Sequence, residues 1–576
     1  MKTIIRIAIA GGGPGGLFMF KRLVETKRQD IQITIFEKNG RLGAGMPYSR
    51  EGAGEEHITN VSGNEIPKLI TPLSDWISTV PKDTLKKFHI DPDRFNDYKV
   101  LPRLLFGQYL ADQFELLQHQ ATERGVAFEV NYHSKVTDII DYPDERVVYV
   151  EINGEKRFAF DHVVTCTGHH WPVKYEGKVP NFFDSPYPPE KLSLRLDHAV
   201  AIKGSSLTAV DAVRTLARHN GIFDRNKDGK LIYSLDTVSP NFKMIMHTRH
   251  GMLPAVRFHL EDSHLTNKSL LSPGELAAHI AANGGFLSLD FVFEKDFKLP
   301  VKEKDPAFYE KIKDMRLEEF VDAMLELREE LDPFQLLKAE YAEAEKSIKR
   351  RESIYWKEML GVLSFALNYP AKYLSAEDMK RLKKSLAPLI SLVIAYMPQS
   401  SSEELIALHD AGVLGLFTVG EDSEVVAVAE GGARYNYIDE SGRPLSVYFN
   451  TYVNCSGQPH IDFEDFPFKS LITKKTVSPA RLKFRNPEQA QQAMAAGEAV
   501  EGDENGGYFL MVSGIAVNDH FQVVDEYGAF NNRIYVMAVP YIGGYNPDYS
   551  GLDFSEAASA AVIKALVPND EHIQVA

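Results

Sequence analysis

The chain has 576 residues, of which 44% are hydrophobic and 25% are charged, a composition typical of a globular protein with a sizeable core. Its 80 acidic residues outnumber 64 basic ones, and the net charge of -16 argues against a general nucleic-acid or anionic-membrane surface. The length indicates more than one domain. The longest apolar run, 386–397, is too short to span a bilayer. The apolar N-terminus leads into glycines that must stay attached, so we expect a cytoplasmic protein rather than a cleaved signal peptide.

The strongest motif lies at the N-terminus. An apolar run at 4–10 predicts a strand, and Gly11-x-Gly13-x-x-Gly16 follows at the start of a helical pattern. These glycines permit a tight turn, close approach of a pyrophosphate and close helix–strand packing. A helix N-terminus suits phosphates, and Glu37, at the end of a second predicted strand, is placed to accept hydrogen bonds from a ribose. The pattern predicts a dinucleotide-binding unit, and further strand–glycine turns along the chain favour FAD as its ligand.

A second, degenerate form of this pattern begins near residue 199. A predicted strand ends in Gly204-Ser205-Ser206-Leu207-Thr208-Ala209, with Ser206 at the position of the middle glycine. The next predicted strand, 243–247, ends in Thr248-Arg249, where a guanidinium can bind the 2′-phosphate of NADPH bidentately. The pattern predicts a nicotinamide site that prefers NADPH to NADH. The alternative for Arg249 is a surface arginine that pairs with the acidic exterior.

The two cysteines, Cys166 and Cys455, each end an apolar strand-like run. Because no C-x-x-C is present, a redox disulfide is excluded, and we expect two small buried apolar residues. A segment with the look of a calcium loop, 224–235, has Leu235 where a bidentate glutamate is needed, so we expect a hairpin turn. We predict no metal site.

Between about 302 and 411 the chain becomes charged and amphipathic with helical spacing, broken at Pro333. We expect a helical insertion that roofs the active site, or equally an oligomerisation surface. Four arginines are candidates for holding a carboxylate substrate, although surface roles are more common: Arg103, Arg257, Arg481 and Arg485.

The segment "HITNVSGNE" resembles the Thr-Asn-x-Ser segment of flavin-containing monooxygenases, except that Gly63 stands where those enzymes have Lys. Four further stretches carry the resemblance: "RLGAGMPYS", "LPRLLFGQYL", "RHGMLP" and "GGYNPDYSGL". Together with the two dinucleotide motifs they resemble a bacterial FAD/NAD(P)-binding flavoprotein family. That family includes N-hydroxylating enzymes that form nitrosuccinate from aspartate, and urate-hydroxylase-like members.

The resemblance implies a catalytic role for Asn60, which would hydrogen-bond near flavin N5 and steady a C4a-hydroperoxide. Thr59 and Ser62 would shape the same wall. The alternative for Asn60 is an asparagine that satisfies loop backbone groups. The full set of residues that we expect to contact a cofactor is Gly11, Gly13, Pro14, Gly15, Gly16, Glu37, Lys38, Met46, Thr59, Ser62, Arg103, Val136, Thr167, Gly168, Gly204, Ser205, Ser206, Thr208, Arg249, Gly544, Asn546 and Leu552.

We therefore predict an α/β protein with two dinucleotide-binding (Rossmann-like) domains and a helical insertion. Residues 1–195 and 446–576 would form the FAD domain, and residues 196–445 the NAD(P) domain. The predicted function is an FAD-dependent, NAD(P)H-dependent monooxygenase acting on a small molecule with O2, with N-hydroxylation of a small amine or amino acid as the resemblance suggests. We expect neither a nucleic-acid nor a membrane partner, and homo-oligomerisation stays open.

Two alternatives compete with this function. The first is an NAD(P)H-dependent flavin reductase or dehydrogenase without oxygenation. The second is a flavin-binding protein with a regulatory role, suggested by Ser206 and by Ala538-Val539, where many relatives have Gly-Asp.

Overall fold

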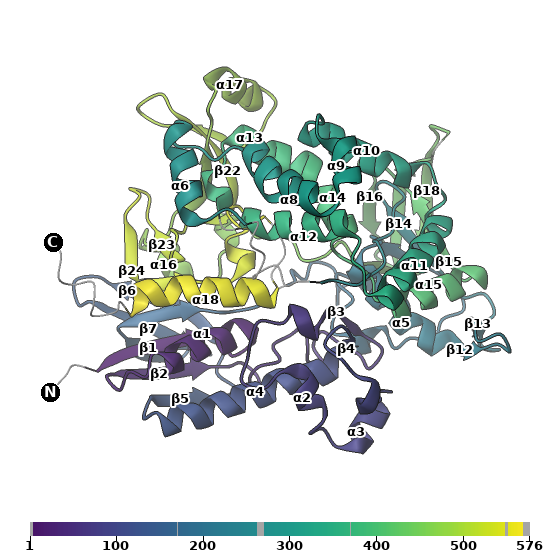
Figure 1. Ribbon diagram of the computed structural model, residues 1–576, viewed down its shortest axis with the longest axis horizontal. Helices are drawn as coiled ribbons and strands as arrows, with labels where there is room; N and C mark the ends of the chain where they lie inside the picture. The colour runs from purple at the N-terminus through teal and green to yellow at the C-terminus, as the bar shows by residue number, and fades with distance from the viewer. Residues whose placement is uncertain are drawn as a thin grey trace.

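Two separate parallel sheets form the framework of the protein (Figure 1). The computed structural model describes residues 4–169, 171–261, 270–368, 370–439, 441–547 and 551–567. The first sheet has the order β23-β24-β9-β1-β2-β5, and only β23 runs antiparallel to its neighbour. Its strands are β1 (Ile5–Ala10), β2 (Ile31–Phe36), β5 (Ala127–Asn131), β9 (His162–Thr165), β23 (Gln522–Val524) and β24 (Phe530–Val536).

Helices cover this sheet and explain why its central strands are almost continuously apolar. The helix after β1, α1 (Pro14–Glu25), packs on α4 (Arg103–Glu123), with Phe20 and Phe114 stacked 5.4 Å apart. The last helix, α18 (Leu552–Leu566), lies alongside α1 although most of the chain separates them (Figure 1). The C-terminal part of the chain thus completes the first domain.

The second sheet has the order β10-β19-β11-β14-β15, and all its strands are parallel. They are β10 (Phe182–Phe183), β11 (Ala199–Lys203), β14 (Lys243–Thr248), β15 (Leu414–Thr418) and β19 (Thr451–Asn454). Helices α5 (Leu207–Asn220) and α15 (Gln399–Asp410) pack on it around an apolar core that includes Val213, Met246 and Leu405. The fold class that the sequence predicts is confirmed.

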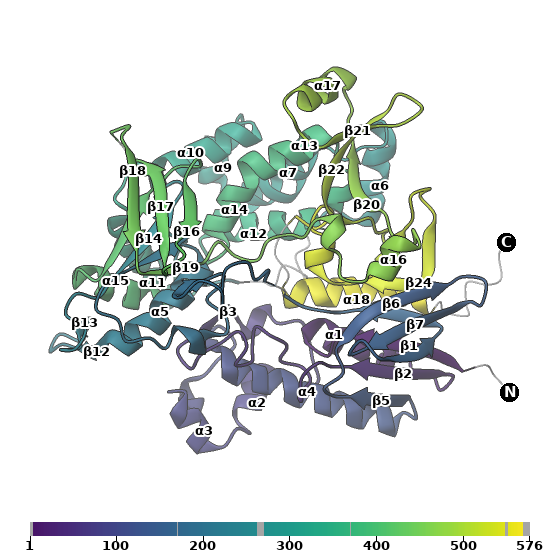
Figure 2. The ribbon, with the colours of Figure 1, turned by 180° about the vertical axis from the view of Figure 1, so that it is seen from behind.

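Helices fill most of the chain between β14 and β15 and form a separate layer over the sheets (Figure 2). The layer comprises α6 (Pro273–Ala282), α7 (Leu289–Phe293), α8 (Leu299–Lys304), α9 (Pro306–Ile312), α10 (Leu317–Glu329), α12 (Tyr355–Asn368), α13 (Ala376–Arg381) and α14 (Ala387–Val393). Within the same stretch of chain, α11 (Pro333–Arg350) packs with α15 in the core of the second sheet. The core of the layer takes in Leu482 and Leu510 from a small sheet of β20 (Pro479–Lys483), β21 (Val500–Gly502) and β22 (Tyr508–Ile515), and Phe484, which directly follows β20. The helical layer therefore also rests on the C-terminal part of the chain.

Smaller elements complete the architecture. The strands are β3 (Ile58–Ser62) with β4 (Val100–Pro102), β6 (Val136–Tyr142) with β7 (Val147–Ile152) and β8 (Lys156–Phe160), β12 (Gly221–Arg225) with β13 (Leu231–Leu235), and β16 (Glu424–Ala427) with β17 (Ala433–Ile438) and β18 (Pro444–Phe449). The short helices are α2 (Leu73–Ile77), α3 (Lys82–Lys87), α16 (Lys469–Thr473) and α17 (Pro487–Ala495). The β12–β13 pair confirms the hairpin expected in place of a calcium loop.

The sheets divide the chain differently from the predicted boundaries in two places. β10 and β19 lie outside the segment predicted for the nicotinamide domain, yet both pair within the second sheet. The helices start at Pro273 rather than near 302. Short strands such as β10 have too few residues for a period to assign them, so only pairing reveals their sheet. None of the helices in the described residues combines the length and apolar character needed to cross a bilayer.

Candidate functional site

The turn after β1 has the geometry that a dinucleotide motif requires. Gly11 has φ +107°, and a Cβ there would lie 2.7 Å from the carbonyl oxygen of Cys166. A Cβ on Gly16 would lie 2.2 Å from the carbonyl oxygen of Gly11, so helix and turn are in contact. Gly13 is the N-cap of α1, whose first turn carries no acidic side chain. Backbone amides at this helix end therefore face a region suited to phosphate.

Glu37 follows β2 directly and organises the same turn. Its buried carboxylate accepts hydrogen bonds from the backbone N–H of Gly12 at 2.9 Å and of Asn39 at 2.8 Å. This places an acid where the second strand of a dinucleotide unit holds a ribose. Lys38 is half exposed and pairs with Glu51 at 3.0 Å.

The loop that carries Met46 lies against the start of α1. A Cβ on Gly13 would be 3.2 Å from Cα of Gly45, and one on Gly45 would be 2.9 Å from Cδ of Pro14. Gly15 lies over Cys166, since a Cβ there would be 3.5 Å from Cβ of Cys166. At Gly13 and Gly45 a Cβ would come closer than an ordinary van der Waals contact, so residues without side chains allow these backbones to approach. The donor set and the narrow glycine cradle fit FAD.

The remaining predicted FAD residues come from separate parts of the chain. Thr167 and Gly168 follow β9, at the same sheet edge as Gly11. Val136 begins β6 and is half-buried. Gly544 donates its N–H to Ser513 at 2.8 Å, Asn546 is buried, and Leu552 begins α18; each position stays a prediction for cofactor contact. Residues 548–550, which belong to the quoted C-terminal motif, lie outside the described residues, and so does His170.

The second unit repeats the first at backbone level. Gly204 follows β11 with φ +105°, and a Cβ there would lie 2.8 Å from the carbonyl oxygen of Cys455. Its N–H donates to His247 at the end of β14 at 2.8 Å, as Gly11 donates to Phe36 at the end of β2 at 2.9 Å. Both cysteines are buried and free, as predicted.

The predicted nicotinamide residues gather at this edge. Ser206 is the exposed N-cap of α5, and Thr208 is half-buried in its first turn. Ser205 donates its hydroxyl to the carbonyl of Met252 at 2.6 Å, which fixes the segment after β14. Arg249 is exposed just past β14, and no hydrogen bond or ion pair joins it to any residue that the structure describes.

The Thr-Asn-x-Ser segment forms β3. Thr59 accepts the N–H of Leu101 at 3.1 Å and donates its hydroxyl to Val61 at 2.8 Å. Ser62 forms a capping box with Glu65 and accepts from Arg257 at 2.7 Å. The side-chain amide of Asn60, which is half-buried, forms no hydrogen bond with any described residue. Thr59 and Ser62 are thus occupied by the protein, and Asn60 presents a donor and an acceptor.

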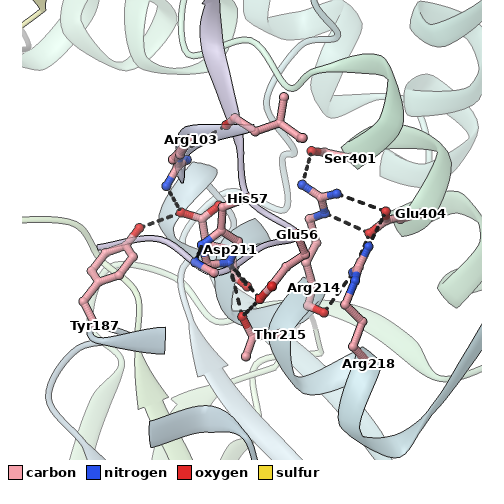
Figure 3. A network of polar contacts seen from close by, with 12 residues as sticks. Glu56, His57, Arg103, Tyr187, Asp211, Arg214, Thr215, Arg218, Ser401 and Glu404 are labelled. Carbon is pink, nitrogen blue, oxygen red and sulfur yellow. Dashed lines mark hydrogen bonds and ion pairs between the residues drawn. The ribbon is translucent and has the colours of Figure 1, made fainter. Parts of the chain in front are cut away.

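A buried polar network joins β3 and α4 to α5 (Figure 3). Arg103 pairs with Asp211 at 2.5 Å and donates to the carbonyl of Ile58 at 3.1 Å. Tyr187 donates to the same Asp211 carboxylate at 2.7 Å. We predicted Arg103 to contact the cofactor or a carboxylate substrate, but in the structure its guanidinium holds the two domains together. The sequence missed Asp211 because nothing local marks it as buried.

His57 lies within this network as a neutral imidazole. Its Nδ1 accepts the N–H of Gly54 at 3.0 Å, so Nε2 carries the proton and donates toward the carbonyl of Asp211 and the hydroxyl of Thr215, both at 3.2 Å. Burial is the main cause that lowers the pKa of His57. Burial also opposes ionisation of Asp211, but the charge of Arg103 and the hydrogen bonds from Arg103 and Tyr187 lower the pKa of that carboxyl.

A second part of the network buttresses α5. Arg214 and Arg218, one turn apart, both bind Glu404 of α15, with N–O distances from 2.7 to 3.0 Å (Figure 3). Arg214 also donates to Ser401 at 3.1 Å. Burial would raise the pKa of Glu404, but the two guanidinium groups lower it to about 2.

The other candidate arginines have structural contacts. Arg257 is buried and pairs with Glu65, and it also donates to the carbonyl of Asn60. Arg481 lies over Phe509 and Arg485 over Phe286. The Ser-x-x-Glu spacing of Ser62 and Glu65 is a capping-box signal that could have marked Glu65 from the sequence. In the described part of the chain, no three His, Cys, Asp or Glu side chains gather to hold a metal ion.

Residues 8–170 match the family described as FAD-NAD(P)-binding. The predicted cofactor class, FAD with NAD(P), is confirmed. Residues 272–394, in the helical layer, match the family described as YdhS-like middle domain. The uncharacterized protein YdhS of Escherichia coli (strain K12) is 27% identical over 478 residues, which cover 81% of this chain and 85% of that protein.

Solved structures also resemble the chain. DfoA, a cadaverine monooxygenase from Erwinia amylovora solved with FAD, is 12% identical with a TM-score of 0.47, over 98% of this chain and 95% of that one. L-lysine 6-monooxygenase from Pseudomonas syringae is 12% identical with a TM-score of 0.41, over 97% of this chain and 98% of that one. Likenesses this distant do not bear on the chemistry.

Proposed function

We propose that this chain is an FAD-dependent, NAD(P)H-dependent monooxygenase. One oxygen atom of O2 would go to a small-molecule substrate and the other would leave as water, with NAD(P)H supplying two electrons. The observation that carries the proposal is the Asn60 amide, which forms no hydrogen bond with any residue that the structure describes, in a segment where Thr59 and Ser62 are occupied. A cytoplasmic location belongs to the same proposal.

The residues present suggest a division of labour around FAD. When bound, FAD would supply the redox chemistry, the transfer of two electrons from the nicotinamide to O2. The amides at the start of α1 bind phosphate, and Glu37 holds a ribose. Asn60 would offer a fixed donor and acceptor beside the reacting atoms, where preorganised polar groups stabilise developing charge and limit loss of oxygen as H2O2.

NADPH is the proposed electron donor. Arg249 lies just past β14, one residue after Thr248, which corresponds to Glu37 because Gly204 and Gly11 donate to His247 and Phe36; Arg249 is exposed without an acidic partner among the described residues. A guanidinium there attracts a 2′-phosphate, whereas the carboxylate of Glu37 would repel one. N-hydroxylation of a small amine or amino acid is the proposed reaction, and it rests on the sequence resemblance.

The test is a measurement of coupling. NADPH oxidation, O2 uptake and H2O2 release are followed with and without a panel of primary amines and amino acids. A monooxygenase converts a substrate to an oxygenated product while the H2O2 share falls. A reductase oxidises NADPH with artificial acceptors under nitrogen and oxygenates nothing. A regulatory flavoprotein keeps FAD but oxidises NADPH under neither condition.

Asn60→Ala is the decisive variant. We expect a larger share of H2O2 per NADPH, because the amide that retains the oxygen is lost. Asn241→Ala is the control, since Asn241 is exposed and lies before β14, at the opposite edge of its sheet. Unchanged coupling in Asn60→Ala would show that Asn60 has no role in oxygen transfer.

A further inference from the structure

The segment 249–257 runs from the second dinucleotide unit to β3. It begins at Arg249, just past β14, and ends at Arg257, which reaches the strand that carries Asn60. Its course is tied down on the way. Ser205 donates to the carbonyl of Met252 at 2.6 Å, and Arg328 of α10 donates to the carbonyl of Leu253 at 3.0 Å.

The far end of this segment is held equally firmly. Ala255 donates its N–H to the carbonyl of Leu392 at 2.8 Å. Met397 donates its N–H to the carbonyl of Ala255 and accepts the N–H of Arg257, both at 2.8 Å, which forms a short parallel bridge. The backbone between the nicotinamide site and Arg257 is therefore bonded to the helical layer. Because these backbone hydrogen bonds leave residues 252–257 little freedom to adjust, a displacement of the backbone at Ser205 or Arg249 should also shift Arg257.

At β3 the guanidinium of Arg257 makes three contacts. It donates to the carbonyl of Asn60, to the Ser62 hydroxyl at 2.7 Å, and to the carboxylate of Glu65. Both partners of the ion pair are nearly enclosed, with side chains 4% and 11% exposed. A planar fork with several donors can satisfy such acceptors at once, whereas an ammonium cannot reproduce that geometry.

We propose that Arg257 is a positioning residue that holds Asn60 in a place set by the second dinucleotide site. The arginine acts on the backbone of Asn60 and leaves its side-chain amide available. Occupation of the Ser205–Arg249 edge by NADP+ would then be felt at the flavin through residues 249–257. This inference rests on the proposed function for the identity of the two sites, but its test needs no turnover.

The experiment uses the full chain with FAD bound. NADP+ is titrated while the flavin absorption spectrum is recorded, and NADP+ affinity is measured separately by calorimetry. We expect NADP+ to perturb the wild-type flavin spectrum. In Arg257→Lys we expect NADP+ to bind with unchanged affinity while the spectral perturbation is lost, because the fork that fixes β3 is gone.

Arg533→Lys is the matched control. Arg533 also forms a fork with a buried carboxylate, Asp141, at 3.0 and 2.8 Å, but it connects β24 to β6 within the first domain. It should keep both binding and perturbation. If Arg257→Lys does not fold, Glu65→Gln weakens the same pair while an oxygen remains for the Ser62 N–H, and it should reduce the perturbation.

The outcomes separate the inference from the proposed function. A full spectral perturbation in Arg257→Lys, or none in the wild-type protein despite NADP+ binding, would overturn the positioning role alone. Absence of NADP+ binding by calorimetry in the wild-type protein would remove the second dinucleotide site, and the positioning role with it. Loss of perturbation in Arg533→Lys as well would show a general loosening and would also count against Arg257.

Discussion

The two dinucleotide units of this protein share a backbone and differ in chemistry. When the two sheets are aligned on β1 and β11, the strands that lead into the turn glycines, the strand orders β24-β9-β1-β2-β5 and β10-β19-β11-β14-β15 correspond position by position. The turn glycines have φ +107° and +105° and face a cysteine carbonyl in both units. Past the residue that accepts from the turn glycine, the first unit has Glu37 after Phe36, and the second has Thr248 and then Arg249 after His247. The shared backbone suits phosphate binding, whereas the side chains after the second strand distinguish a ribose 2′-hydroxyl from a 2′-phosphate.

The helices after the two turns are supported in a similar way. Lys21 and Arg22 of α1 both bind Glu556 of α18, and Arg214 and Arg218 of α5 both bind Glu404 of α15. The close-packed glycine is not repeated, since Ala209 stands where Gly16 lies against the turn. The second helix therefore has room for a Cβ at this position.

The largest expected effect comes from the turn glycines. Gly11→Ala should give protein without FAD, and Gly204→Ala should keep FAD but lose reduction by NADPH. In each case a left-handed φ and a Cβ within 2.8 Å of backbone add strain of about 1–3 kcal/mol and displace the cradle. Gly229→Ala, with φ +79° but nothing within 4 Å, is the control for strain alone. FAD content and anaerobic reduction are the readouts, and loss of FAD from Gly204→Ala would contradict the independence of the units.

The second effect concerns Glu404. Its pKa is about 2 in the fold and about 4.3 in an unfolded chain, so the ionised form adds about 2–3 kcal/mol of stability near neutral pH. Because the folded pKa is the lower one, this stability is lost as pH falls from about 5 to about 2. Glu404→Gln should lower the free energy of unfolding at pH 7. In urea titrations at several pH values, the free energy of unfolding should also fall less steeply between about pH 5 and about pH 2 than it does in the wild-type protein. Glu556→Gln should cost less, since Glu556 is more exposed; an equal cost would show that the two helices are held alike.

The smallest effect distinguishes the ribose-binding residues. Arg249→Ala should raise the KM for NADPH by about 10–100-fold, the value of one or two charged hydrogen bonds, and leave that for NADH unchanged. Steady-state kinetics with both nucleotides measure it. Lys227→Ala, another cationic side chain of the second domain, serves as the control. Equal losses with NADPH and NADH would mean that Arg249 does not contact a 2′-phosphate.

Local patterns were enough to predict the two turns and much of the secondary structure. Glycine spacing, apolar runs and the acid or arginine after the second strand act over a few residues, so stereochemistry decides them. The helical layer was also predicted, from its apolar period, although its start was placed too late. Its dependence on β20 and β22 could not be seen, because that contact joins segments far apart in the chain.

The roles of charged residues depended on packing alone. Arg103 and Arg257 resemble ligand-binding arginines in the sequence, but their partners Asp211 and Glu65 lie 108 and 192 residues away. An arginine on a protein surface and one in a buried pair have the same local signature, and only desolvation between packed domains makes the partner obligatory. The backbone conformation that a glycine permits is a local property, whereas the partner of a charged side chain depends on the residues that the fold packs around it. The two glycine turns could therefore be predicted from the sequence, whereas the ion pairs around Asn60 became apparent only in the tertiary structure.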